Sequence, residues 1–140
     1  MSFSNTTEEN ILNGLFRSAA FSKPSELWIA LLTATPDEAS TGNFTTSTGT
    51  EVSGGSYARQ QLDPSDSNWT DPDGVGYVRN NAKISFPKAT ADWGTITHAA
   101  ICTASTNGNV IAYAELTSSK TIETNDVLEF DINALQVSLD

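Results

Sequence analysis

The sequence predicts a mainly β protein: an antiparallel β-sandwich or jelly-roll-like domain with one short N-terminal α-helix. Helical spacing of apolar residues is confined to residues 4–20, whereas short apolar segments separated by turn residues occupy the rest of the chain. No internal repeat is visible, which argues against a long repetitive shaft. The 140 residues suit one domain with its own core, so we expect a single domain over residues 1–140, with the sandwich at 25–140.

The helix is expected at residues 4–20. Thr6 and Glu9 have the spacing of a capping box, and the residue before Pro24 avoids helical dihedral angles, which ends the helix. One face would carry an apolar stripe formed by Ile11, Leu12, Leu15 and Phe16. We expect this stripe to pack on the protein's own sandwich, with insertion into a neighbouring subunit as the alternative.

The first strand and two long loops follow the helix. Leu27–Thr33 is apolar on both faces, which is typical of a central strand. Residues 34–56 are polar and without a period, and residues 63–76 form a second polar loop around Trp69. A stretch as long as 34–56 without its own structure is uncommon in a compact domain, so it is a candidate functional or inter-subunit loop.

The middle strands are predicted at residues 77–86, 95–103 and 109–116. The last two would form a hairpin, because Asn107-Gly108 favours a type I′ turn with positive φ at both positions. Three large aromatic residues in or beside predicted strands are expected in the core, namely Trp28, Phe86 and Trp93.

The final segment, residues 127–139, changes phase. Alternate apolar residues from Leu128 to Ala134 favour one face, whereas those from Leu135 to Leu139 favour the other. Because a shift of one residue reverses every side chain of a strand, we expect a bulge or corner near Asn133-Ala134.

The charge of the chain excludes several classes of partner. There are 17 acidic and 7 basic residues, a formal net charge of −10, with the basic residues scattered. This pattern argues against nucleic acid and against anionic membrane surfaces. The first residues have no signal-peptide pattern, and no apolar run approaches the ~20 residues of a membrane span, so we expect synthesis in a cytosol.

Candidate catalytic residues are sparse. His98 is the only histidine and would share a strand face with Ile96, Ala100 and Cys102. Four residues along a strand separate Cα atoms by ~13 Å, too far for a direct hydrogen bond between His98 and Cys102. We therefore expect a structural histidine, a buried cysteine, and no catalytic, cofactor-binding or metal-binding residues: the protein is predicted not to be an enzyme.

The acidic loop has some features of a calcium site. Asp71-Pro-Asp73-Gly74 has the form of the opening of a calcium loop, but glycine stands at the fourth position and Ala82 at the twelfth, where a bidentate Glu is required. Turn formation by Asp-Pro and Asp-Gly is the expected role. An irregular site built from Asp63, Asp66, Asp71 and Asp73 is the alternative.

Several segments resemble a family of short structural proteins of tailed-phage virions, often labelled phage tail-fibre-like proteins. They are, in order, Leu27–Pro36, Glu51–Gln60, Ile84–His98, Gly108–Tyr113, Leu116–Ile122 and the ending through Leu139. The most specific are Gly54-Gly-Ser-Tyr-Ala-Arg-Gln60 and Ala91-Asp-Trp-Gly-Thr-Ile-Thr-His98. The loop at 63–76 looks longer than is usual in this family.

The resemblance implies a non-enzymatic component of the virion, assembled in the host cytoplasm. A compact subunit without a repetitive shaft suits a capsid cement or decoration protein. The alternative is a tail fibre or a tail-tip or baseplate component with receptor or glycan binding. Expected partners are the major capsid protein or tail proteins, and the chain itself as a homo-trimer, which suits three-fold lattice positions.

Interface candidates are aromatic residues in polar surroundings, which are typical contact residues of protein interfaces. They are Phe3, Phe16, Phe21, Phe44 and Trp69. A glycan-binding module would use Trp69 or Tyr77 for stacking, and a depolymerase would need a pair of carboxylates beside its substrate.

Overall fold

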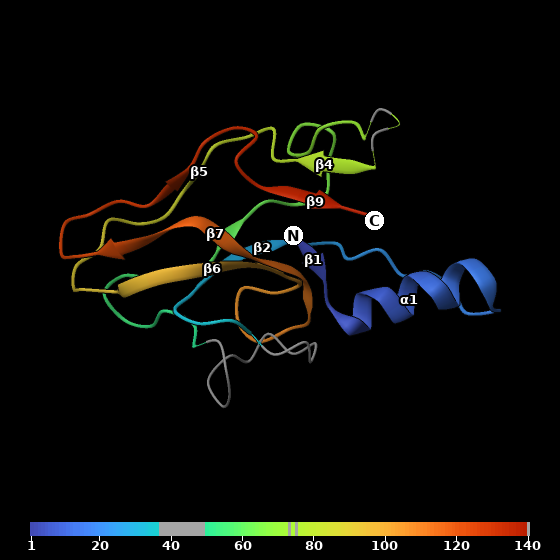
Figure 1. The fold of residues 1–140 in the computed structure, drawn as a ribbon, viewed down its shortest axis with the longest axis horizontal. Helices are drawn as coiled ribbons and strands as arrows, with labels where there is room; N and C mark the ends of the chain where they lie inside the picture. The colour runs from blue at the N-terminus through green and yellow to red at the C-terminus, as the bar shows by residue number, and fades with distance from the viewer. Residues whose placement is uncertain (37–49, 73, 75, 140) are drawn as a thin grey trace.

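The computed structural model describes residues 1–36, 50–72, 74 and 76–139. Two layers of antiparallel strands lie one above the other, and a helix projects from one end (Figure 1). The predicted class, mainly β and sandwich-like with one short N-terminal helix, is confirmed in the described part of the chain.

The main layer is a five-stranded sheet in the order β1-β7-β6-β2-β3. Its strands are β1 (Ser2–Phe3), β2 (Trp28–Leu32), β3 (Gln60–Gln61), β6 (Gly94–Cys102) and β7 (Val110–Ile122). Strand β2 is buried from Ile29 to Leu32, as predicted for an interior strand with two apolar faces. Strands β6 and β7 form the predicted hairpin, with positive φ at Asn107 and Gly108.

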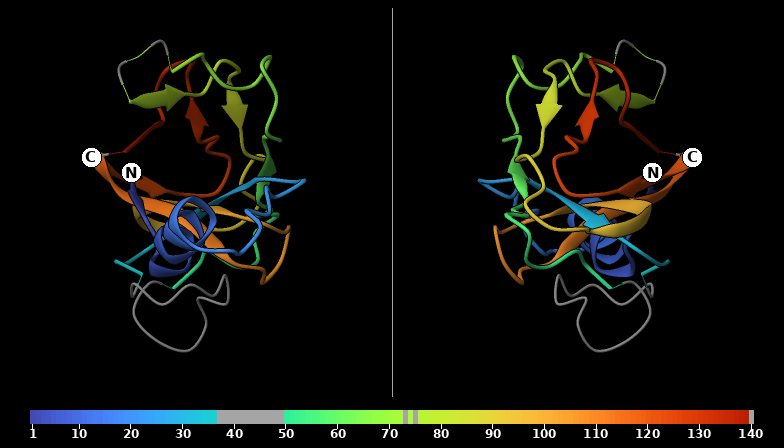
Figure 2. Two further views of the ribbon diagram at one scale, coloured as in Figure 1. Left: turned by 90° about the vertical axis from the view of Figure 1, so that its right-hand side faces the viewer. Right: turned by 90° about the vertical axis from the view of Figure 1, so that its left-hand side faces the viewer.

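The second layer consists of two short ribbons, seen facing the main sheet in Figure 2. Strand β4 (Tyr77–Arg79) pairs with β9 (Gln136–Ser138), and β5 (Ile84–Ser85) pairs with β8 (Glu129–Phe130). The prediction of one strand over 77–86 is therefore wrong, since Asn80 and Asn81 interrupt it. The corner predicted in the last segment is confirmed, because Asn133 has φ 66° between β8 and β9.

Buried Asn80 bonds to the backbone at two breaks of the second layer, the one between β4 and β5 and the one between β8 and β9. Its side-chain N–H groups donate to the carbonyl oxygens of Ala82 and Asp131, each at 2.8 Å, and its side-chain oxygen accepts from the backbone N–H of Leu135 at 2.8 Å. Its backbone carbonyl accepts from the N–H of Asn133 at 2.8 Å. One side chain thus satisfies the backbone groups that two broken strands leave unpaired, which buried backbone requires.

The main core lies between the layers and draws on both. Its largest members include Ile29 and Leu31 of β2, Ile101 of β6, and Phe86 and Trp93 beside the strands. The core position predicted for Phe86 and Trp93 is confirmed. Trp28 is half-buried, and its indole N–H donates to Glu26 at 3.1 Å, so its prediction as a core residue is wrong. It begins β2, where the partner strand β3 is only two residues long.

An irregular pairing between β6 and β7, with the extra residues on β7, changes which residues of β6 share a face. Ile96 pairs with Lys120 but His98 pairs with Glu115, so Thr97 lies opposite residues 116–119. Ile96 consequently joins the core between the layers, whereas Ala100 and Cys102 lie in a smaller cluster on the other face of the sheet. The prediction that Ile96 shares a face with Ala100 and Cys102 is wrong, because strict alternation fails at a bulge.

The end of the predicted loop 34–56 belongs to the sheet. The N–H of Thr33 donates to the carbonyl of Thr50, and the N–H of Val52 donates to the carbonyl of Leu31. These bonds extend the edge of β2 beyond β3, so residues 50–52 were wrongly predicted as loop. They satisfy backbone groups that an edge strand would otherwise expose.

Candidate interaction surfaces

An N-terminal arm projects from the sandwich (Figure 1). It consists of α1 (Asn5–Phe16) and a return segment, residues 17–25, that leads back to β2. The helix begins at Ser4, whose side chain accepts a hydrogen bond from the N–H of Thr7. The N-cap is thus Ser4 and not Thr6. The helix ends at Phe16 and not at residue 20, because the chain turns back at Arg17 with extended dihedral angles.

The inner face of the arm is made of small and polar residues. Thr7 is buried, and Thr7 and Asn10 line a hollow with Pro24. A Cβ atom added to Gly14 would lie 2.9 Å from the Cβ of Phe21, so the absence of a side chain at Gly14 lets the return segment approach. The arm is therefore held together by its polar and small-residue side.

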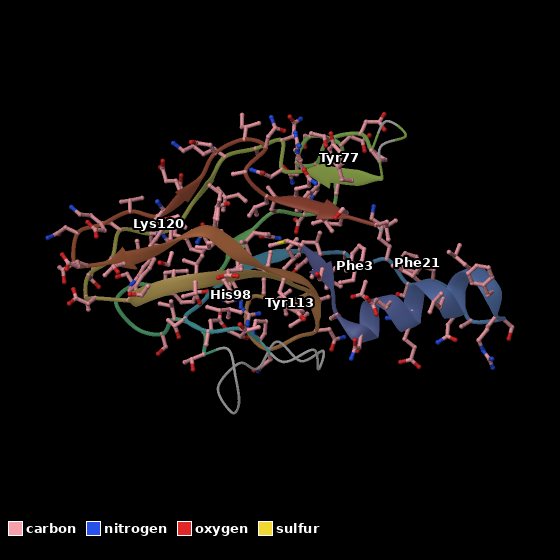
Figure 3. All side chains as sticks on the ribbon, in the orientation of Figure 1. Phe3, Phe21, Tyr77, His98, Tyr113 and Lys120 are labelled. Carbon is pink, nitrogen blue, oxygen red and sulfur yellow. The ribbon has the colours of Figure 1, made fainter. Side chains whose placement is uncertain are left out.

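The apolar side of the helix faces outward. The exposed fractions are 57% for Leu12, 72% for Leu15 and 79% for Phe16, and Phe21 on the return segment is 58% exposed. Figure 3 places Phe21 on the arm, away from the strands. The expectation that the stripe packs on its own sandwich is wrong, since the small-residue face occupies the inner side. We call Leu12, Leu15 and Phe16 the outer stripe.

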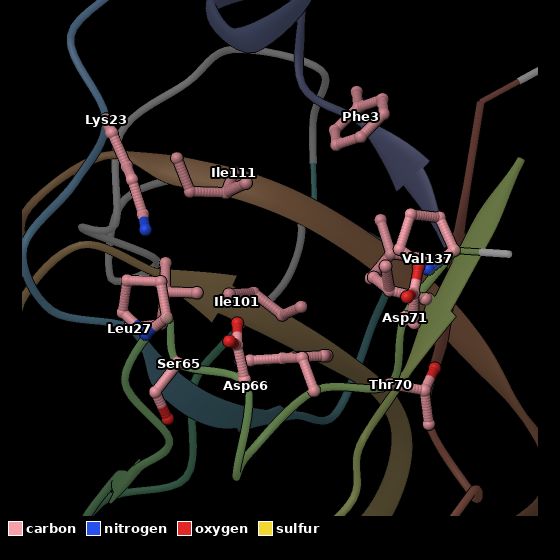
Figure 4. A pocket seen from close by; sticks show the side chains of 14 residues that line it. Phe3, Lys23, Leu27, Ser65, Asp66, Thr70, Asp71, Ile101, Ile111 and Val137 are labelled. Atoms are coloured by element: carbon pink, nitrogen blue, oxygen red, sulfur yellow. The ribbon is translucent and has the colours of Figure 1, made fainter.

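A groove of about 690 Å³ lies at the base of the arm. Its floor is apolar and includes Ile101, Ile111 and Val137, whereas Asp66 and Asp71 from the second loop stand at its rim (Figure 4). Trp69 lines it as well, half-buried, with its indole N–H donating to the carbonyl of Leu62 at 3.2 Å. Lys23 reaches the groove from the return segment.

A second groove of about 580 Å³ opens between β7 and the ribbon of β8. Leu116, Val127 and Phe130 contribute apolar surface to it, and Val127 is half exposed. Glu115 and Lys120 from β7 lie at this groove with opposite charges.

Buried charges occur at the edge of β2. The guanidinium of Arg59 donates to both carboxylate oxygens of Glu51 at 2.7 Å, and to the carbonyls of Ala104 and Asn107 at 2.8 and 3.0 Å. The Tyr57 hydroxyl donates to Glu51 at 2.8 Å and accepts from the N–H of Leu31 at 3.0 Å. This arrangement ties three loops to the sheet, which is a structural role.

Burial and neighbouring charges shift the pKa values of the groups at this edge of the sheet. Burial, the largest single cause, lowers the pKa of Arg59, but the hydrogen bond to Glu51 and the interactions with the negative charges of neighbouring groups together outweigh it, so the pKa of Arg59 is raised. Burial, followed by the negative charge of Glu51, raises the pKa of Tyr57 far above its ordinary value. Burial also raises the pKa of Cys102 to about 12, although Arg59 opposes the change.

His98 and Cys102 lie in structural surroundings. His98 is buried, with one ring nitrogen 2.8 Å from the hydroxyl of Thr97 and the other 3.2 Å from that of Thr35. Cys102 is fully buried beside the apolar cluster of β2 and β6. The prediction of a buried cysteine is confirmed, and the buried, hydrogen-bonded setting of His98 agrees with a structural histidine.

Of the candidate calcium residues, Asp63 is engaged in hydrogen bonds within the protein. Asp63 accepts from the N–H of Leu27 and from the amide of Gln61. Asp73 lies outside the described residues, and among those described no group of three or more His, Cys, Asp or Glu side chains could hold a metal ion. No helix in residues 1–36, 50–72, 74 and 76–139 has the length and apolarity of a membrane span.

Comparison with known proteins gives a family. The family described as "Podophage GP4 fiber I protein gp80" matches residues 2–138. The chain belongs to this family. No curated protein matches the sequence.

Membership of the gp80 fibre family supports a structural protein of the phage virion, and confirms the resemblance to tail-fibre-like proteins. It favours our alternative hypothesis, a tail fibre component, over the capsid cement protein that we expected first. The sequence did not favour a fibre component, because the chain has no repetitive shaft. The described structure, a sandwich with a projecting arm, is built without such a shaft.

The interface candidates fall into different settings in this gp80-family chain. Phe16 and Phe21 lie exposed on the arm, whereas Phe3 in β1 and Trp69 are half-buried against the main core. Phe44 lies outside the described residues. Leu12 and Leu15 were missed as interface residues, because the helical period predicted an apolar face but not its direction.

Proposed function

We propose that this protein is a tail fibre component of a short-tailed phage particle. The family match over residues 2–138 carries the proposal. The exposed arm and the grooves beside it supply surfaces for other virion proteins, while the acidic excess keeps the free subunit soluble. The function is non-enzymatic in this proposal, in keeping with a fibre family; His98, Glu51 and Asp92, for example, are engaged in hydrogen bonds of the fold.

The position on the particle is testable by copy number. Purified virions are digested and the peptides of this chain are quantified by mass spectrometry against those of the major capsid protein. A fibre component gives a few to some dozens of copies per particle, and a bound antibody appears at the tail in electron micrographs. A ratio near one to one with the capsid protein, with label over the head, would contradict the proposal.

A second element of the proposal concerns the groove at the base of the arm. Proteins commonly hold sugars between an aromatic ring and polar side chains, and this groove brings Trp69 together with Asp66, Thr70 and Asp71 above an apolar floor. We propose that the fibre contacts a surface glycan of the host cell there (Figure 4). An apolar floor favours sugar faces, and carboxylates accept hydrogen bonds from sugar hydroxyls.

Glycan binding is tested on the purified protein with a glycan array. Asp66→Ala and Asp71→Ala together should abolish the signal, and Asp131→Ala, at an 87% exposed side chain of the second layer, should keep it. Equal signals from both variants would place binding elsewhere, and an array without hits would leave the fibre proposal standing on particle location alone. The homo-trimer stays a prediction. Its argument came from capsid lattice positions, which the family match does not favour.

A further inference from the structure

We propose that two copies of this chain associate through their arms, which lie antiparallel so that the tip of each arm contacts the base of the other. The outer stripe is the surface that pairs. This inference concerns self-association, is an alternative to the predicted homo-trimer, and stands whether or not the fibre position is correct.

The apolar surface runs from the stripe to the base of the arm. A hollow of about 440 Å³ lies there, and its lining includes Phe3, Ile11 and Leu12 together with Leu139 at the end of the second layer. Leu139 is 63% exposed. Leu15 and Phe16 lie at the other end of the helix, so the arm has exposed apolar side chains at its tip and an apolar hollow at its base.

This arrangement is self-complementary. Residues four apart, here Leu12 and Phe16, form a ridge on the helix, and two helices that pack ridge into groove have their axes ~8–10 Å apart. A two-fold axis near the middle of α1 would place Phe16 of each copy at the other copy's hollow. An isologous contact of this kind uses the same patch on both subunits, and it closes after two copies.

The charges of the arm agree with the antiparallel order. Glu8 lies on the same side of the helix as Leu12 and lines the hollow at the base, whereas Arg17 is exposed at the tip. A two-fold pair therefore brings the helix end that carries Arg17 toward the helix end of the other copy that carries Glu8. A parallel pair would instead bring like charges together at both ends.

The charge distribution favours a second copy of this chain as the partner that covers the outer stripe. Residues 5–25 contain Glu8, Glu9, Arg17 and Lys23 and have no net charge, so the formal charge of −10 lies entirely on the rest of the chain. Two sandwiches repel one another, and the neutral arms are the part by which two copies can meet. Projection of the arm keeps the two acidic bodies apart.

The size of the contact sets its strength. Burying the outer stripe on each copy removes roughly 400 Å² per copy, below the ~800 Å² per partner of standard interfaces. The dimer should therefore dissociate on dilution in the micromolar range, and neighbouring subunits of an assembly would reinforce it.

The first test is the mass in solution by sedimentation equilibrium over a hundredfold range of concentration. The intact protein should approach the mass of two chains at high concentration. Leu15→Glu and Phe16→Glu should each weaken the dimer at least tenfold, because a charge on the stripe must be desolvated on pairing. Ile132→Glu is the matched control, since Ile132 is 54% exposed on the second layer, and it should leave the dimer intact.

The second test is an exchange of charges. Glu8→Arg or Arg17→Glu should each weaken the dimer, since either change places like charges opposite one another. The double variant Glu8→Arg, Arg17→Glu should regain dimerisation. Circular dichroism of each variant checks that α1 is retained. A monomer at every concentration, a trimer, or a double variant no stronger than the single ones would overturn the proposal.

Discussion

The side-chain oxygen of Asn80 accepts a hydrogen bond from the backbone N–H of Leu135 at 2.8 Å, across 55 residues of sequence. The same side chain donates to the carbonyls of Ala82 and Asp131. Asn80 is fully buried, so water cannot replace these hydrogen bonds. They explain how the second layer breaks into two ribbons without losing its backbone hydrogen bonds.

Asn80→Ala should therefore destabilise the protein by about 3 kcal/mol or more, since one N–H and two carbonyls lose a buried partner and each such loss costs ~1–3 kcal/mol. Urea unfolding followed by tryptophan fluorescence measures the change. Asn81→Ala, at an exposed neighbouring position, should change the free energy of unfolding by less than ~0.5 kcal/mol. Equal effects of the two variants would remove the structural role assigned to Asn80.

The stability of the folded protein should also depend on the ion pair of Arg59 and Glu51. Arg59→Met should cost about 3–5 kcal/mol, because it leaves a partly buried carboxylate and the carbonyls of Ala104 and Asn107 without their donor. The comparison is Lys88→Met at an exposed position, with an expected change below ~0.5 kcal/mol. Thermal unfolding of both variants gives the result, and a loss below ~1 kcal/mol for Arg59→Met would contradict it.

Cys102 should be unreactive in the folded protein. Its pKa is raised to about 12 by burial, so the thiolate that attacks disulfide reagents is scarce at pH 8 and is also inaccessible. Labelling with an aromatic disulfide should be complete within minutes in urea. Under native conditions it should proceed only at the rate of unfolding. Rapid labelling of the native protein would show that the sheet face around Cys102 opens locally.

Stability should fall at alkaline pH. The folded-state pKa values of Tyr57 and Cys102 are raised, so both groups favour the folded state fully below their unfolded pKa values of about 10 and 8.5. As pH rises above those values the unfolded chain loses protons first, and folding stability is lost. Urea titrations from pH 7 to 11 should show the decline. Tyr57→Phe should lower stability at pH 7 and make the decline shallower.

The hairpin turn offers a matched pair of glycines. Gly108 and Gly54 both have φ +72°, but a Cβ at Gly108 would lie 2.9 Å from the hydroxyl of Thr103, whereas nothing lies within 4 Å at Gly54. Gly54→Ala should cost about 1 kcal/mol from backbone strain alone. Gly108→Ala should cost at least about 1 kcal/mol more. Equal losses in urea unfolding would show that the turn adjusts to the added methyl group.

Much of the fold was predictable from local patterns. The apolar run at Leu27–Thr33, the Asn107-Gly108 turn and the phase change near Asn133 each reflect a rule that acts over a few residues. The aromatic residues Phe86 and Trp93 were expected in the core because strand residues must bury large apolar surface. The family resemblance spanned nearly the whole chain, and the match over residues 2–138 agrees with it.

The sequence by itself determined the class of fold, the presence of an amphipathic helix and the family. Only the tertiary structure decided that the helix turns its apolar stripe outward, because periodicity defines a face and not the direction in which it points. Likewise, the roles of Asn80 and Arg59 depend on partners that are distant in sequence. Hydrogen bonds over such separations leave no local pattern, since they arise when packing brings the strands together.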